Sequence, residues 1–439
     1  MSPIQYRRSV ALLAAAAFAI SSCGGGGSGG STGSTAACNT QAVLSGATGL
    51  PTTGNVVPMT VDGGPVVNGG LAGTINQAYV TITICAPGST NCQNYDHIWV
   101  DTGSSGLRLF CSAFAATLPT SQLNGNVVAN CEQFINSYVW GAVRVADVKI
   151  AGESASSVPI QVIGDTTVPA SAPSSCASGT AINSVGGMNG MGANGILGIG
   201  VFQEDCGLGC QNNSPPPASF YYTCPGGTCS SVNMAIASQL QNVVGLFPVD
   251  NNGTLIQMPS LPTGSAPTAT GSLIFGIDTQ SNNMLGNALV FAVSPDNVPS
   301  LTPGFIDTTT TYGDMSEPAS YIDSGSNGFF FNDPALTLCT GTSSGFYCPT
   351  STTPLSATMK SYVGSTNLTS FTYNFDIADI LSSTDIAFND VGGPSGACTN
   401  TPCTFDWGLP FFYGRNVFTA IEGMTIGGNL GPFFAASTP

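Results

Sequence analysis

The chain has 439 residues, of which only 7 % are charged, and its formal net charge at pH 7 is −16. With seven Lys and Arg residues in total, it lacks the basic surface that phosphates require, which argues against nucleic-acid binding. So few charged residues also cannot form long helices with Glu and Lys on an outer face. Short runs rich in Val, Ile, Phe and Thr, separated by Gly and Asn, predict an all-β protein with mainly antiparallel strands and few short helices.

The N-terminus has the pattern of an export signal. Two arginines precede the apolar stretch Val10–Ile20, and small residues then lead to Cys23 in a sequence that resembles a bacterial lipobox. We therefore expect a lipoprotein signal peptide over residues 1–22 and a lipid on Cys23, which would anchor the protein to the cell envelope at the outer membrane or periplasmic face. Plain secretion with cleavage elsewhere is the alternative. Residues 23–37 are rich in Gly and Ser and fit a flexible tether.

The cysteines predict a disulfide-bonded, exported protein. There are fifteen, and the removal of Cys23 leaves fourteen, enough for seven bridges in an oxidising compartment. A zinc site is the alternative, but the chain contains no Cys-x-x-Cys and His97 is its only histidine, so we expect no metal and no cofactor. Spacing does not prove a pairing, but it favours Cys85–Cys92, Cys111–Cys131, Cys206–Cys210, Cys224–Cys229, Cys339–Cys348 and Cys398–Cys403, with Cys38 and Cys176 left for a long-range bridge.

In chain order, the first half reads as a series of strands. Gly190–Gly195 matches a dinucleotide-binding pattern, but the strand-like run that follows takes the place of the required helix, so we attribute the match to chance. Apolar residues at helical spacing make Val232–Val244 the best helix candidate. The strands predicted here are Val56–Val61, Tyr79–Cys85, Asp96–Val100, Leu107–Cys111, Ser137–Ile150 and Val158–Ile163.

The second half begins after a stretch at 259–270 that is rich in Pro, Ser and Thr and resembles a linker. Further strands are predicted after it, at Ser272–Gly276, Ala288–Val293, Gly304–Thr309 and Ala319–Asp323. The two halves are weakly similar to each other, which predicts a duplicated lobe. We place the N-terminal lobe at residues 38–270 and the C-terminal lobe at residues 271–439.

One short motif occurs in both halves. The apolar run Ile98–Val100 leads into Asp101-Thr102-Gly103-Ser104, and Tyr321-Ile322 leads into Asp323-Ser324-Gly325-Ser326. A single copy could be an Asx-type turn. Two copies, each after a strand, favour a site in which the carboxyl groups lie together. Two carboxylates about 3 Å apart cannot both ionise, so they share a proton and can activate a water while protonating a carbonyl.

These residues resemble a known family, the pepsin-type aspartic peptidases with two lobes. Val100–Ser105 and Ile322–Ser326 are similar to its two active-site turns, Asn194–Gly200 to the glycine-containing strand of its first lobe, and Gly271–Asp278 to the start of its second lobe. The resemblance implies a bilobal pepsin-like fold and peptide-bond hydrolysis by Asp101 and Asp323. The lipoprotein layout also resembles an uncharacterised family of bacterial lipoproteins.

The resemblance further implies a role for each neighbour of the two aspartates. Gly103 and Gly325 allow tight turns, Ser104 and Ser326 bond to the outer carboxylate oxygens, and Thr102 and Ser324 brace the turns against each other. A hairpin that carries Tyr138, Trp140 and Gly141 is the expected flap over the cleft.

The sequence departs from the family pattern at three places. Arg108 stands where the family has a Trp that supports the flap. The expected flap has Trp140-Gly141 in place of the usual Tyr-Gly, in a hairpin that looks shortened. Asp406-Trp407-Gly408 replaces an apolar-apolar-Gly element.

We therefore expect a monomeric, lipid-anchored aspartic endopeptidase that acts on polypeptides without a cofactor. The alternative is a catalytically weak or inactive pepsin-like scaffold that binds protein or glycan at the cell surface.

Overall fold

A computed structural model describes residues 38–46, 50–134, 136–187, 190–217, 219–294, 308–362, 365–366, 369–380, 384–395 and 404–437. The predicted signal peptide, the tether, Cys23 and the Cys398–Cys403 pair lie outside these residues. Within them the chain is built almost entirely of strands, and α1 (Leu208–Asn212) is the one α-helix. The prediction of an all-β fold with few short helices is confirmed. No helix in the described ranges is long and apolar enough to cross a membrane.

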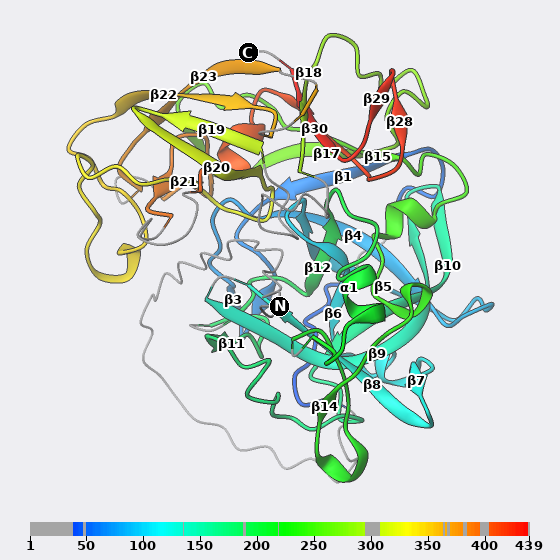
Figure 1. Cartoon of the computed structure of the whole chain (residues 1–439). Helices are drawn as coiled ribbons and strands as arrows, with labels where there is room; N and C mark the ends of the chain where they lie inside the picture. The colour runs from blue at the N-terminus through cyan, green and yellow to red at the C-terminus, as the bar shows by residue number, and fades with distance from the viewer. Residues whose placement is uncertain are drawn as a thin grey trace.

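The first half forms a sheet around the strand that carries Asp101, drawn in blue to green in Figure 1. Its strands alternate buried and less buried residues or are buried throughout, as expected for sheets with a packed face. The main strands are β4 (Ala78–Cys85), β5 (Cys92–Asp101), β6 (Ser105–Phe110), β8 (Asn126–Gln133), β9 (Ser137–Ile150), β10 (Glu153–Ile163), β12 (Gly195–Ile199) and β13 (Tyr221–Thr223). Short strands complete this half: β2 (Val66–Val67), β3 (Gly70–Leu71), β7 (Gln122–Leu123), β11 (Thr180–Ala181) and β14 (Ser230–Ser231).

Strands from the beginning, middle and end of the chain join this sheet to the second half (Figure 1). They are β1 (Val56–Val61), β15 (Gly253–Gln257), β17 (Ala269–Phe275), β18 (Leu289–Ala292), β27 (Asn416–Ala420) and β30 (Phe433–Ala436). They pair in the order β18-β30-β27-β15-β17-β1-β4. The boundary expected between residues 270 and 271 falls inside β17, where a division would break the ladders to β1 and β15.

The second half contributes a separate sheet in the order β23-β22-β19-β20-β26-β21-β25, shown in yellow and orange in Figure 1. Aromatic residues cluster beside its strands: the rings of Phe331 and Phe405 stack with centroids 5.0 Å apart, and the ring centroids of Trp407 and Phe405 are 4.5 Å apart. The strands are β19 (Thr308–Tyr312), β20 (Met315–Ile322), β21 (Phe329–Phe330), β22 (Thr353–Lys360), β23 (Ser370–Ile377), β25 (Gly392–Gly393) and β26 (Asp406–Trp407). The remaining short strands are β16 (Ser265–Ala266), β24 (Ala387–Phe388), β28 (Thr425–Ile426) and β29 (Asn429–Leu430).

The same three-strand motif surrounds each aspartate turn. In the first half β12 lies between the strands before and after the turn, parallel to β5 and antiparallel to β6. In the second half β26 lies parallel to β20 and antiparallel to β21. Two such motifs, one per lobe and joined by shared strands, give the pepsin-like two-lobed fold.

The predicted helix at Val232–Val244 is wrong. The segment contains only two short 3-10 turns, Ile236–Ser238 and Val243–Leu246. The Gln239 amide nitrogen donates to the carbonyl oxygens of Gly207 and Met234, and the Asn242 side chain accepts from the Val244 amide. Amide side chains that bond to the backbone in this way stabilise irregular structure at the expense of a helix.

Four of the predicted disulfides are confirmed: Cys85–Cys92, Cys206–Cys210, Cys224–Cys229 and Cys339–Cys348.

Cys111–Cys131 and Cys38–Cys176 are wrong, because the bonds are Cys38–Cys111 and Cys131–Cys176. Cys111 directly follows β6, Cys131 lies in β8, and strands β10 and β9 separate β6 from β8. Three strand spacings are about 14 Å, beyond the reach of a disulfide. Six disulfides among the described residues indicate an oxidising, extracellular or periplasmic compartment.

Candidate active site

The structure brings the two aspartate turns into direct contact. Strand β5 ends at Asp101 and β20 ends just before Asp323, and both carboxyl groups are buried, with 2 % and 0 % of the residue exposed. A Cβ on Gly103 would lie 2.8 Å from the Asp323 carboxyl group, and one on Gly325 would lie 2.6 Å from Asp101 Oδ1. Each glycine therefore makes room for the carboxyl group of the opposite turn.

Each carboxyl group is held by its own turn in the same way. Gly103 N–H donates to Asp101 Oδ1 at 2.8 Å, and Ser104 Oγ donates to Asp101 Oδ2 at 2.5 Å. In the second turn, Gly325 N–H donates to Asp323 Oδ1 at 2.7 Å, and Ser326 Oγ donates to Oδ2 at 3.0 Å. Donors at both oxygens fix the orientation of each carboxyl plane.

Thr102 and Ser324 connect the turns through four reciprocal hydrogen bonds. Thr102 Oγ1 donates to the Ile322 carbonyl at 3.1 Å and accepts from Ser324 N–H at 2.9 Å. Ser324 Oγ donates to the Val100 carbonyl at 2.8 Å and accepts from Thr102 N–H at 3.2 Å. Both side chains are buried. The relative position of the aspartates therefore depends on backbone and hydroxyl groups from both lobes.

The electrostatics of the pair are asymmetric. Burial raises the pKa of Asp323 well above its usual value of 3.8, and the charges of Asp101 and then Asp406 raise it further, as does a hydrogen bond with Asp101. The surroundings of Asp323 therefore favour its protonated form. A neutral Asp323 can share its proton with Asp101 in the way that adjacent carboxyl groups do.

Asp406 is a third buried acid near the pair, and sequence reasoning noted it only as an irregularity. Its place in β26 is opposite Tyr321 of β20 and Phe330 of β21, and it is completely buried. Burial raises its pKa well above 3.8, the Ser326 hydroxyl lowers it, and the charge of Asp101 raises it. Neither carboxyl oxygen makes a well-formed hydrogen bond among the described residues, since Ser326 Oγ donates to Asp323. The sequence did contain a signal for this residue, because Asp406 is an acid in an element where the family pattern has an apolar residue.

The expected flap residues Tyr138, Trp140 and Gly141 lie in strand β9. Tyr138 and Trp140 line a cavity of about 330 Å³ whose described lining includes neither aspartate. Trp140 donates from Nε1 to the Pro169 carbonyl at 2.8 Å and packs edge-on against Tyr222. A Cβ on Gly141 would lie 2.0 Å from the Val162 carbonyl oxygen, so this glycine is required for strand packing. The role of these residues over the aspartates stays a prediction.

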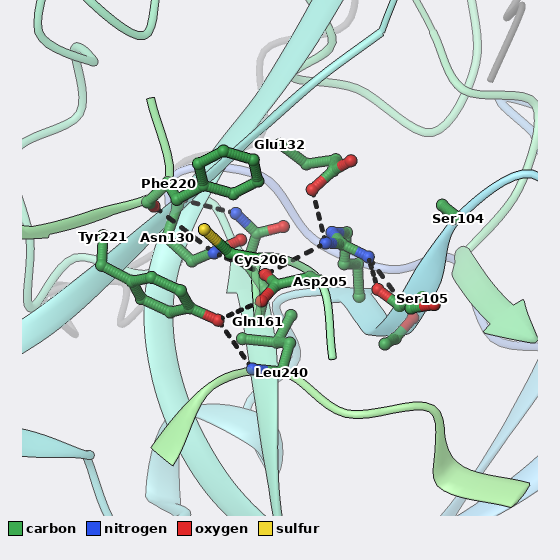
Figure 2. Close-up of polar contacts among 12 residues, drawn as sticks. Ser104, Ser105, Asn130, Glu132, Gln161, Asp205, Cys206, Phe220, Tyr221 and Leu240 are labelled. Atoms are coloured by element: carbon green, nitrogen blue, oxygen red, sulfur yellow. Dashed lines mark hydrogen bonds and ion pairs between the residues drawn. The ribbon is translucent and has the colours of Figure 1, made fainter. Parts of the chain in front are cut away.

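Arg108 is completely buried directly behind the Asp101 turn. Its Nη1 donates to the carbonyl oxygen of Ser105 at 2.9 Å, and its Nη2 lies 2.6 Å from Glu132 Oε2 and 3.6 Å from Asp205 Oδ2. Figure 2 shows Ser105, Glu132 and Asp205 around this guanidinium group. Sequence reasoning found the arginine but neither carboxylate, because both are remote in sequence and lie in no motif.

Comparison with known proteins gives a family and a distant similarity to solved structures. Residues 51–436 match the model of a family described as "Protein of unknown function (DUF3443)". No curated protein matches the sequence. A crystal structure of an aspartic proteinase from Irpex lacteus matches with 14 % identity over 87 % of this chain and 96 % of that chain, at a TM-score of 0.42.

Proposed function

We propose that this chain, which belongs to the DUF3443 family of proteins of unknown function, is an aspartic endopeptidase of the cell envelope. The observation that carries the proposal is the pair of buried aspartates in symmetric turns, each with the same two donors and each facing a glycine of the other turn. An ordinary Asx turn explains one such aspartate, but not two whose carboxyl groups lie in contact across two lobes.

In the proposed reaction Asp101 is the base and Asp323 is the acid. Asp101 takes a proton from a water molecule while the water oxygen bonds to the peptide carbonyl carbon, and Asp323 gives its proton to the carbonyl oxygen. The resulting diol collapses when the carbon–nitrogen bond breaks. Asp101 then protonates the leaving nitrogen, and a diol hydroxyl returns a proton to Asp323. The assignment follows from the raised pKa of Asp323, for which burial and the charges of Asp101 and Asp406 are responsible.

The location and substrate of the enzyme belong to the same proposal. A lipid on Cys23 would hold the monomer at the outer membrane or periplasmic face, with residues 23–37 as the tether. The disulfides of the described part are compatible with that compartment. The substrate would be a polypeptide in an extended form.

The deciding experiment is digestion of a peptide library by the purified protein between pH 3 and pH 7. Asp101→Asn and Asp323→Asn should each lower kcat by about 10²- to 10⁴-fold, because each removes a group that moves a proton. Asp147→Asn is the matched control, since the Asp147 carboxylate accepts from the exposed amides of Gly88 and Ser157, away from both aspartate turns. Cleavage that survives either active-site substitution would refute the peptidase.

A binding scaffold is the second candidate, and a cavity in the first lobe favours it. Tyr138 and Trp140 border this cavity, whose volume of about 330 Å³ is enough for a small ligand group. An inactive wild-type protein across the whole pH range would favour this candidate. Loss of ligand binding by Tyr138→Ala together with full retention by Asp101→Asn would then support it.

A further inference from the structure

Arg108 occupies a place at which the fold does not require a charge. In the first lobe Arg108 of β6 lies opposite Ile196 of β12, and in the second lobe Phe330 of β21 lies opposite Asp406 of β26. Phe330 is thus the counterpart of Arg108, and it is buried with 1 % exposure. Because the second motif forms with an aromatic residue here, the guanidinium must be explained by what it contacts.

The guanidinium connects the Asp101 turn to a strand outside the motif. On one side it donates to the carbonyl oxygens of Ser105 and Gly106, at 2.9 and 3.4 Å. Ser105 directly follows Ser104, whose hydroxyl donates to Asp101. On the other side lies Glu132 of β8, 2.6 Å away, in the hairpin that β8 forms with β9. One side chain therefore bonds both to the backbone of the turn and to the hairpin (Figure 2).

A third segment closes this network. Asp205, in the segment after β12, lies 3.6 Å from the guanidinium and accepts from Tyr221 Oη at 2.6 Å and from Asn130 Nδ2 at 3.2 Å. Tyr221 Oη in turn accepts from the Leu240 amide at 2.7 Å. The partners of Arg108 are therefore themselves held in place. A planar guanidinium with several donors in fixed directions can join such partners at once, which a lysine ammonium cannot do with the same geometry.

We propose that Arg108 is a positioning residue for the Asp101 turn, which it holds at a fixed place against the β8–β9 hairpin and the segment after β12. Its catalytic importance rests on the proposed peptidase function. Arg108 touches neither carboxyl group of the pair in this arrangement and acts through the backbone of Ser105 and Gly106. Displacement of a catalytic group by about 1 Å can cost about 100-fold in rate, so a small shift of this turn is sufficient to matter.

The test compares Arg108→Lys with Arg144→Lys. Arg144 is also buried, with 4 % exposure, and pairs with Asp165 while donating to the Leu118 carbonyl, so its replacement changes an equivalent ion pair away from the turn. Both variants retain the positive charge. Glu132→Gln, which keeps the shape of its side chain and an acceptor oxygen, tests the hairpin side of the network if Arg108→Lys does not fold.

Hydrogen exchange measured by mass spectrometry tests whether Arg108 holds the Asp101 turn in place, and this test does not require enzymatic activity. In Arg108→Lys or Glu132→Gln we expect exchange of the amides in residues 101–106 and 126–133 to become at least about tenfold faster. In Arg144→Lys those segments should retain wild-type protection. Unchanged exchange at residues 101–106 in the first two variants, or an equal effect of Arg144→Lys, would overturn the positioning role.

Steady-state kinetics tests the catalytic part at a temperature where all variants are folded. Arg108→Lys should lower kcat at least about tenfold while KM changes less than about threefold, because the turn is displaced but substrate contacts remain. Arg144→Lys should change neither constant by more than about threefold. An Arg108→Lys enzyme with wild-type kcat would contradict the proposal. A wild-type protein without cleavage would instead refute the peptidase, and the exchange result would still decide whether Arg108 positions the turn.

Discussion

Ile196 in β12 and Asp406 in β26 occupy the same place in the two lobes, each between the strands that lead into and out of an aspartate turn. Ile196 has an apolar environment that suits it, whereas Asp406 is an acid with no well-formed hydrogen bond among the described residues. At the scale of single residues, the acid in place of an apolar residue gives Asp323 a neighbour that Asp101 does not have at the corresponding place. The charge of Asp406 helps to raise the pKa of Asp323.

We predict that Asp406→Ile, which copies the first lobe, stabilises the protein at neutral pH. Burial raises the folded-state pKa of Asp406 above 3.8, so its contribution to stability is complete below that pH and is lost as the pH rises through the folded pKa. Removal of the acid should raise the free energy of unfolding by about 1–3 kcal/mol at pH 7 and by less at pH 4. Urea denaturation at the two pH values measures this difference. Equal changes at both would show that Asp406 does not titrate on unfolding.

The same substitution should alter the activity profile. Asp323 would lose one of the neighbouring charges that raise its pKa, so it would release its proton at lower pH. The alkaline limb of the pH dependence of kcat/KM should therefore move to lower pH in Asp406→Ile. A limb that stays in place would show that Asp406 is electrostatically separate from the pair.

At the scale of elements, strand β20 delivers Asp323 to the site and also carries a second buried acid, Glu317. Glu317 is completely buried, and neither of its carboxyl oxygens has a hydrogen-bond partner among the described residues. Burial raises its pKa to about 7. A strand of the second lobe thus contains a group that is neutral at acid pH and becomes charged near neutrality.

We predict that Glu317 makes the protein less stable as the pH rises from 4.5 to about 7. Because its folded-state pKa is raised from 4.5, the stabilisation is complete below pH 4.5 and disappears as the pH rises through about 7. Glu317→Gln should remove this dependence, which amounts to about 2–3 kcal/mol for a shift of this size. Thermal unfolding followed across this pH range measures it.

At the scale of the whole molecule, shared strands and hydrogen bonds between the aspartate turns are among the connections that hold the lobes together. The shared strands β1, β15, β17, β27 and β30 run through one sheet (Figure 1), and the Thr102–Ser324 hydrogen bonds join the turns at the site. The shared strands fix the orientation of the two lobes relative to each other. The hydrogen bonds between the turns set the distance between the two carboxyl groups.

We predict that Thr102→Val weakens the contact between the lobes. It leaves the Ile322 carbonyl and the Ser324 amide buried without the partner they have now, at a cost of about 1–3 kcal/mol for each group. Denaturation followed separately at both lobes should then show transitions that no longer coincide. Thr308→Val, which removes one buried hydroxyl bond between β19 and β20 in a single sheet, is the control and should keep one transition. Coincident transitions in Thr102→Val would contradict the prediction.

Local patterns predicted most of the strands, since alternation and strand-forming residues depend on neighbours in the chain. Val56–Val61 and Ser137–Ile150 match β1 and β9. The short disulfide loops were predictable for the same reason, because a loop such as Cys206–Cys210 closes within one segment. The helix predicted at Val232–Val244 does not form, because the amide side chains of Gln239 and Asn242 bond to the backbone of distant segments as well as to their own.

By itself the sequence determined the class of fold, the repeated Asp-Thr/Ser-Gly-Ser turn and the identity of the two candidate catalytic aspartates, because these are properties of short segments. Only the tertiary structure decided the long-range disulfides of Cys38 and Cys176, the partners of Arg108 and the position of Asp406 beside the pair. These features depend on strand order and burial, which bring together residues far apart in the chain. Burial also raises the pKa values of Asp323, Asp406 and Glu317, so the electrostatics of these acids could not be read from composition.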